Sequence, residues 1–230
     1  MKEATGPDLD DDHGWAERFG WAYGLVAPDP AERAAALVRL DRARREAEDA
    51  VLRVHQAWLP TPWLRFKTRD RRAAQRAYEA AADRSLPEAL WGKRAAAEIS
   101  TWPGLPFALL FLEWEARYPQ EWTQHAKEWG TKQSLIRELA SADHDDRART
   151  KLVELVDLVV QRPYRCKDRE YVRVARAVDG EDLRARLHRS HRSENSWAQL
   201  HASYVLWLLD RPEVPNTRHV WRTWLAGSRS

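Results

Sequence analysis

The segment from residue 29 to residue 58 places the strongest constraint on the fold. It opens with "DPAE", in which Asp29 is suited to cap a helix, Pro30 to take the first helical position and Glu32 to stand at the third. No proline or glycine follows before Trp58, so the segment predicts one helix of about 28 residues and about 42 Å. Alternating spacings of three and four mark a seam for packing along another helix or a protein partner. That seam comprises Leu37, Leu40, Arg44, Ala47, Val51, Val54 and Trp58.

The rest of the chain shows helix signals throughout and no clear period-two run of β-branched residues. Prolines, glycines and acidic loops separate the expected helices. Their approximate ranges are 68–83, 87–100, 105–118, 120–129, 132–142, 146–161, 168–178, 181–190, 195–209 and 217–226. The sequence therefore predicts an all-α protein of about ten helices.

Three regions are expected along the chain. Residues 1–28 form an acidic N-terminal tail with a short helix, and residues 29–142 form a tryptophan-rich helical bundle. Residues 143–230 form a helical-repeat-like region that packs on the bundle as part of one continuous domain. The boundary is placed at the acidic loop 142–146, because most tryptophans precede it and a second basic segment follows it.

Composition favours a cytoplasmic protein. The single cysteine, Cys166, excludes an internal disulfide and any cysteine-based zinc cluster. The N-terminal residues 1–13 are acidic, whereas a signal peptide begins with basic and then apolar residues. The longest apolar run, residues 105–114, is far shorter than the roughly 20 residues of a spanning helix, so no membrane association is expected.

Positive charge gathers in two segments although the whole chain has a net charge of only +3. Residues 60–76 carry six cations against one acid, and residues 161–192 carry ten against five, a net of +5 in each. Such segments indicate an anionic partner (nucleic acid, an acidic carrier protein, or a phosphate- or sulfate-bearing ligand), although solvated helix faces are the plainer alternative. The residues predicted to bind the anion are Arg65, Lys67, Arg69, Arg71, Arg72, Arg186 and Arg189.

Tryptophan is unusually abundant, with 13 residues, and most of these side chains are expected in the core. Trp63, Trp221 and Trp224 differ because arginines lie close to them in sequence. That neighbourhood suits cation–π contacts or the rim of a wet pocket. We therefore predict that these three residues form an aromatic binding surface.

Glu115 is the candidate catalytic residue. It lies on the aromatic face of the predicted helix 105–118, so we expect a buried carboxylate that acts as a general base or, alternatively, pairs with a core arginine such as Arg44. Glu113 is instead expected to be exposed, four residues before Arg117. No phosphate-binding glycine loop and no G-x-S-x-G motif occurs, and no cofactor or metal site is predicted.

The stretches "KDREYVRVARAV" and "SENSWAQLHASYVLWLL" resemble second helices of HEAT-like repeats, over residues 145–210. In each, a polar or acidic cap precedes small and β-branched residues, with Val172 and Ala198 at matching positions. The resemblance implies stacked helix pairs with a concave binding face. The same region also resembles the helical-repeat alkylpurine DNA glycosylases. That family uses an acid flanked by tryptophans, whereas Asp157 has no tryptophan beside it.

Three functional hypotheses follow. The first is a binding or adaptor protein that engages an anionic partner through the basic, aromatic-lined surface. The second is an enzyme that acts on an anionic or carrier-bound small molecule in an aromatic-walled helical pocket, with Glu115 as base. The third is a HEAT-like DNA glycosylase.

Overall fold

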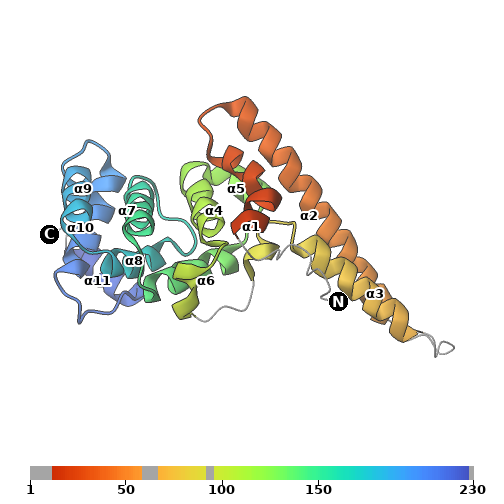
Figure 1. The fold of residues 1–230 in the computed structure, drawn as a ribbon. Helices are drawn as coiled ribbons and strands as arrows, with labels where there is room; N and C mark the ends of the chain where they lie inside the picture. Colours follow the sequence, from red (N-terminus) through yellow and green to blue (C-terminus); the bar gives the residue numbers. More distant parts are fainter. Residues whose placement is uncertain (1–11, 59–66, 92–95, 228–230) are drawn as a thin grey trace. The chain divides into compact units, whose positions relative to one another are not determined.

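The computed structural model describes residues 12–58, 67–91 and 96–227. Within these ranges the chain is all-helical, with eleven α-helices and four short 3-10 helices and no strand, which confirms the predicted fold class (Figure 1). The residues group into two units. The first contains Met1–Lys93, Pro106–Trp114 and Tyr118–Lys127, and the second contains Arg94–Leu105, Glu115–Arg117 and Glu128–Ser230.

The first unit is built around the long helix α2, Pro30–Trp58, which has 29 residues. Asp29 caps it as expected, because its Oδ1 accepts a hydrogen bond from the backbone N–H of Ala31 at 3.0 Å. The unit's other elements are α1 (Asp12–Phe19), η1 (Gly20–Val26), α3 (Lys67–Ala82), η2 (Glu88–Trp91), most of α4 (Leu105–Arg117) and α5 (Pro119–His125).

Aromatic side chains fill the core of the first unit. Trp15 and Phe19 of α1 contact Phe107 of α4, with ring centroids 5.8 and 5.7 Å apart. Phe111 contacts the fully buried Trp122 of α5 at 5.7 Å. The expectation that Glu113 is exposed is wrong: it is 7% exposed, because residues 107–116 of α4 are buried on all sides.

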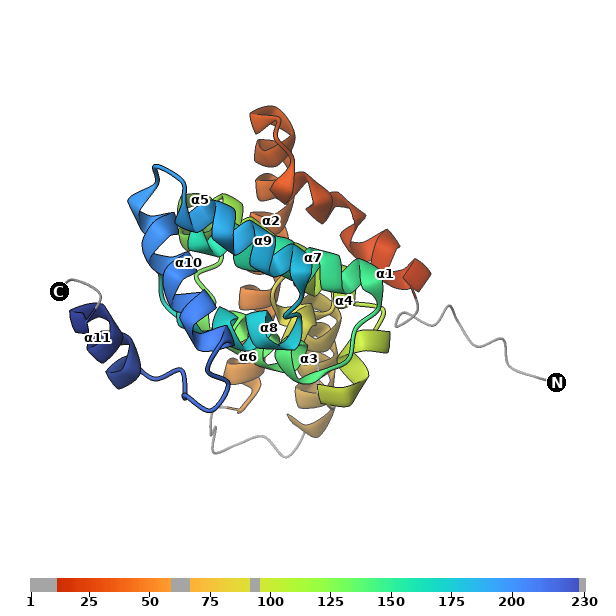
Figure 2. The same cartoon turned by 90° about the vertical axis from the view of Figure 1, so that its left-hand side faces the viewer.

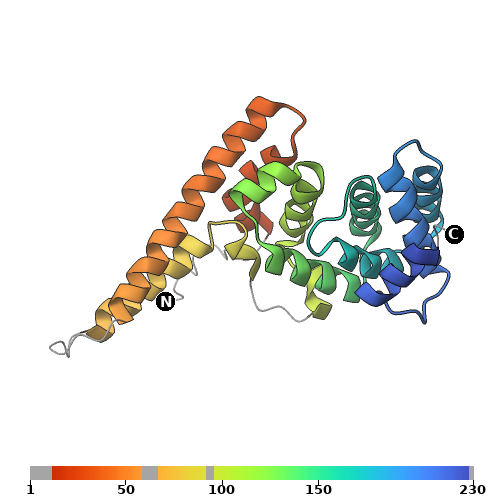
Figure 3. The same cartoon turned by 180° about the vertical axis from the view of Figure 1, so that it is seen from behind.

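Helices α2 and α3 form an antiparallel hairpin (Figures 1 and 3). Leu40 and Ala47 of the predicted seam are buried, whereas Ala50 is buried in place of the predicted Val51. Trp58 departs from the expected seam, since it is 61% exposed. Ala57, one residue earlier, is half-buried, so this side of α2 runs through Ala36, Ala50 and Ala57 in place of Leu37, Val51 and Trp58.

The second unit contains η3 (Ala96–Thr101), α6 (Trp129–Ser141), α7 (Asp146–Val160), η4 (Asp168–Glu170), α8 (Tyr171–Ala177), α9 (Glu181–His191), α10 (Ser196–Leu209) and α11 (Arg218–Gly227). Helices α7, α8, α9 and α10 pack on one another (Figure 2). Asp145 caps α7 by accepting from Ala148 N at 2.8 Å, and Asn195 caps α10 through Trp197 N at 3.1 Å. Leucine and valine side chains of α7, α8, α9 and α10 form the core.

Two helix boundaries differ from expectation. The helix expected at 87–100 is replaced by η2 and η3, and Gly92, a poor helix former, falls between them in sequence. Helix α5 ends at His125 and α6 begins at Trp129, because Lys127 adopts a left-handed conformation with φ of 55° that stops the helix between them.

Candidate functional site

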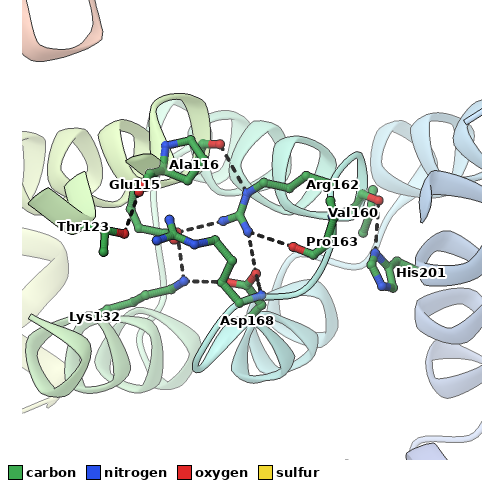
Figure 4. Close-up of polar contacts among 11 residues, drawn as sticks. Glu115, Ala116, Thr123, Lys132, Val160, Arg162, Pro163, Asp168 and His201 are labelled. Atoms are coloured by element: carbon green, nitrogen blue, oxygen red, sulfur yellow. Dashed lines mark hydrogen bonds and ion pairs between the residues drawn. The ribbon is translucent and has the colours of Figure 1, made fainter. Parts of the chain in front are cut away.

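Glu115 is the centre of a buried ionic network in the second unit (Figure 4). Its Oε2 accepts a hydrogen bond from Lys132 Nζ of α6 at 2.8 Å. Lys132 also pairs with Asp168 of η4. All three side chains have no exposed surface. The expectation of a buried carboxylate held by a core cation is therefore met by Lys132 and two arginines, in place of Arg44.

The two arginines come from the loop between α7 and η4. Arg162 bridges both carboxylates, with Nη2 2.9 Å from Glu115 Oε2 and Nη1 2.6 Å from Asp168 Oδ2. Arg165 donates from Nη1 to Glu115 Oε1 at 2.9 Å, and its backbone N–H donates to Asp168 Oδ2 at 2.6 Å. Both oxygens of each carboxylate are thus bound by donors.

This closed arrangement gives Glu115 a structural role in the geometry at hand. Isolated buried charges are costly, and a network survives only when every member is paired and hydrogen-bonded. A general base needs a free lone pair within reach of a substrate proton, whereas Glu115 is fully buried and bonded to three cations. The catalytic role of Glu115 therefore stays a prediction, and none of its contacts in the network supports that role.

An aromatic cluster lies on the other side of the same loop. Tyr164 stacks on His201 of α10, with centroids 3.6 Å apart and rings 3° from parallel. Burial lowers the pKa of His201 to about 4, so the imidazole is neutral at pH 7. Its Nδ1 lies 3.3 Å from the carbonyl oxygen of Val160 (Figure 4).

Two of the three predicted aromatic residues belong to this cluster. Trp221 and Trp224 of α11 lie 5.5 Å apart, and both contact Tyr204 of α10, at 4.7 and 5.0 Å. Both side chains are half-buried, so they attach α11 to the unit while keeping part of their surface in solvent. Trp63 lies outside the described residues.

Of the predicted anion-binding residues in the second unit, Arg186 already has acidic partners. Its Nε lies 3.1 Å from Asp182, and its Nη1 lies 3.7 Å from Asp157 of α7. The hydrogen bond to Asp182 raises the pKa of Arg186. Arg189, one turn further along α9, is exposed. Asp182 and Asp157 therefore compensate the positive charge of Arg186 within the second unit.

The predicted residues of α3 have a different environment. Arg65 lies outside the described residues, and so does the side chain of Lys67. Arg71 turns towards α2, where its Nε donates to the carbonyl of Ala57 at 3.0 Å and its guanidinium lies 4.7 Å from the centre of the Trp58 ring. Arg69 and Arg72 point to solvent.

Arg76 extends this exposed face. Arg69, Arg72 and Arg76 are spaced three and four residues apart, so their side chains share one side of α3. Among the described residues, none of the three has an ion-pair or hydrogen-bond partner. We call Arg69, Arg72 and Arg76 the arginine face.

The ionic network was missed at the sequence level apart from Glu115. A usable signal is Lys132, since it precedes Leu135, Ile136 and Leu139 at the spacing of one helical face. A lysine on an apolar face needs a buried carboxylate. No comparable signal identifies Arg162 and Arg165, because both lie in a loop whose course depends on tertiary packing.

Comparisons of the chain with models of protein families, with curated proteins and with solved structures find no match. Among the described residues, no group of three or more His, Cys, Asp or Glu side chains is arranged to hold a metal ion. No helix in the described ranges combines the length and apolar character needed to cross a membrane.

Proposed function

We propose that the protein is a binding or adaptor protein that engages an anionic macromolecule through the arginine face of α3. The carrying observation is that Arg69, Arg72 and Arg76 are exposed on one side of the helix and lack an acidic partner among the described residues. Arginines without internal partners keep all their guanidinium N–H groups available for an external oxyanion. The nearby acids, Asp70 and Glu79, leave α3 with net positive charge.

The spacing of the arginine face suits a polymeric anion. Arg69 and Arg76 are separated by seven residues, or about 10 Å along the helix axis. Three guanidinium groups over that distance can each bind a different phosphate of one nucleic-acid strand. A nucleic-acid backbone is therefore the partner that we favour, and an acidic protein surface is the alternative outcome of the test.

The test is binding of fluorescent single- and double-stranded DNA and RNA, measured by anisotropy between about 50 and about 200 mM salt. The wild-type protein should lose affinity steeply as salt rises. The variant with Arg69→Ala, Arg72→Ala and Arg76→Ala should bind more weakly, and the slope of log affinity against log salt should fall by about three, one for each lost phosphate contact.

A matched control removes the same charge elsewhere. Arg39, Arg147 and Arg218 are also exposed, and replacing all three with alanine keeps the net charge equal to that of the arginine-face variant. The control should bind nearly as well as the wild type. Equal weakening of the two variants would show that total charge, and not the arginine face, governs binding. If the wild type binds no nucleic acid, an acidic protein partner remains to be tested.

The finer parts of the proposal rest on sequence. We place the protein in the cytoplasm because it has a single cysteine, and cell fractionation tests that placement. The HEAT-like resemblance and the glycosylase alternative stay predictions, and a base-excision assay on alkylated DNA tests the latter. The enzyme alternative loses support from the complete burial of Glu115.

A further inference from the structure

A hollow of about 390 Å³ lies on the second unit between helices α6 and α8. Its lining residues are Arg137, Ala140 and Ser141 of α6 and Arg173 of α8. Ala140 and Ser141 follow Arg137 by three and four residues, so both lie on the same side of the helix as Arg137. Two helices thus bring two arginines, a hydroxyl group and a small apolar wall to one concave site.

Glu170 holds both arginines in place. Arg137 binds it through two bonds, from Nη2 at 2.8 Å and from Nε at 3.2 Å, and Arg173 donates from Nε at 2.9 Å. Gln133 adds a fourth donor at 2.8 Å. Burial alone would raise the pKa of Glu170, but the hydrogen bonds from Arg137, Gln133 and Arg173 lower it to about 2. The carboxylate is therefore ionised at neutral pH and orients both guanidinium groups.

Several donors remain after these bonds are counted. Within the described residues, Arg137 Nη1 and both Nη atoms of Arg173 have no partner. The two arginine side chains are 52% and 58% exposed, so these donors are accessible to a ligand. Two cations and one anion leave the group with a net charge of +1.

We propose that this hollow binds a small phosphate monoester. The two Nη atoms of Arg173 can bind two oxygens of one phosphate group, and Nη1 of Arg137 can bind a third; because Glu170 already orients both guanidinium groups, they lose little freedom on binding. The Ser141 hydroxyl donates its proton to the carbonyl oxygen of Glu138 at 3.0 Å, so it can only accept from a protonated phosphate oxygen. A water molecule takes about 30 Å³ in the liquid, so the hollow of about 390 Å³ has room for much more than a single phosphate group. The remaining space beside Ala140 accommodates the organic part of the ester.

Calorimetric titration at low salt tests the proposal, with inorganic phosphate, ribose 5-phosphate and ribose as probes. The background is the variant that lacks the arginine face, so that α3 cannot contribute to phosphate binding. We expect saturable binding of ribose 5-phosphate, weaker binding of inorganic phosphate and none of ribose. Replacing Arg137 and Arg173 together with alanine should lower the affinity for ribose 5-phosphate by at least about tenfold.

Two controls keep the result interpretable. Arg147→Ala removes an exposed arginine from α7 of the same unit and should leave affinity unchanged. Changing Arg137 and Arg173 to lysine keeps the charge but loses the fork, so affinity should fall to an intermediate value. Circular dichroism melting verifies that each variant is folded. No saturable binding by the background variant, equal binding of ribose, or unchanged affinity after the double alanine change would overturn the proposal.

Discussion

The arginine face of α3 differs from Arg184 and Arg186 of the second unit in what faces the guanidinium groups. On the arginine face of α3, three exposed guanidinium groups have no acidic partner among the described residues. In the second unit, Arg184 lies 2.8 Å from both Asp179 and Asp210, and Arg186 is paired with Asp182 and Asp157. The corresponding sequence segments nevertheless have the same net charge of +5.

This difference shows that segment charge alone does not identify a binding surface. A cation whose partner is supplied by another helix of the same unit spends its hydrogen bonds internally. Asp157 of α7 and Asp210 at the end of α10 do this for Arg186 and Arg184, and both acids are far from their partners in sequence. Pairing in three dimensions decides which positive charge remains available to a partner.

The largest effect should come from breaking the buried pairing. Lys132→Met keeps the approximate volume of the side chain but removes a cation that holds Glu115 and Asp168. The lost compensation should lower the free energy of unfolding by about 3 kcal/mol, measured by urea denaturation. The control Lys151→Met, on the partly exposed surface of α7, should change it by no more than about 0.5 kcal/mol. Equal effects would mean that the network is not the source of the stability.

A second effect concerns Glu170, the carboxylate that pairs exposed arginines. Its pKa is lowered from 4.5 to about 2 in the folded protein, so its ionised form is stabilised by folding. This contribution is fully present above pH 4.5 and is lost as pH falls towards 2. The difference in urea stability between wild type and Glu170→Gln should therefore be largest at neutral pH and shrink in acid. If this difference in stability stays constant down to the lowest pH at which the protein folds, the pKa of Glu170 is not lowered by its hydrogen bonds.

Arg71 tests whether the inward-turned arginine of α3 differs from its exposed neighbour. Arg71→Ala removes the bond to the Ala57 carbonyl and the contact with Trp58, and should destabilise the protein by about 1 kcal/mol. Arg72→Ala should cost less than about 0.5 kcal/mol but weaken nucleic-acid binding more. Thermal and urea denaturation measure the stabilising role, and anisotropy measures the role in nucleic-acid binding. If Arg72→Ala destabilised the protein more than Arg71→Ala, the contacts of Arg71 would not have the stabilising role that we expect.

The smallest expected effect is a gain of function. Changing Asp157 and Asp182 to asparagine leaves Arg186 without a carboxylate partner. In the variant that lacks the arginine face, this change should raise nucleic-acid affinity about threefold at low salt and steepen the salt dependence by about one contact. Asp143→Asn with Asp146→Asn changes the same net charge on exposed residues and serves as the control. If both variants gain the same nucleic-acid affinity, pairing with Asp157 and Asp182 is not what keeps Arg186 from binding nucleic acid.

Sequence reasoning recovers the local features of this fold well. The capping of α2 by Asp29 and the helix expected at 146–161 depend on residues within a few positions of one another, and both are confirmed. The burial of Glu115 follows from the aromatic face of α4 in the same way. Such features require no knowledge of how separate helices pack.

The partners of these residues are not recoverable by the same reasoning. Glu115 pairs with residues 17, 47 and 50 positions away. Periodicity indicates which face of a helix is buried but not which helix covers it. The same reason explains Glu113, whose expected exposure treated α4 as an amphipathic surface helix although residues 107–116 are buried. Trp58 shows the converse error, since a seam position at the end of α2 is exposed.

The loop from Gln161 to Lys167 has a consequence for how this chain can vary in evolution. Arg162 and Arg165 point into the ionic network, while Tyr164 between them stacks on His201 in the aromatic cluster. Loops usually tolerate insertions and deletions, but here one added residue would shift each of these side chains away from its partner. Homologous chains should therefore keep the length of this loop even where its sequence changes.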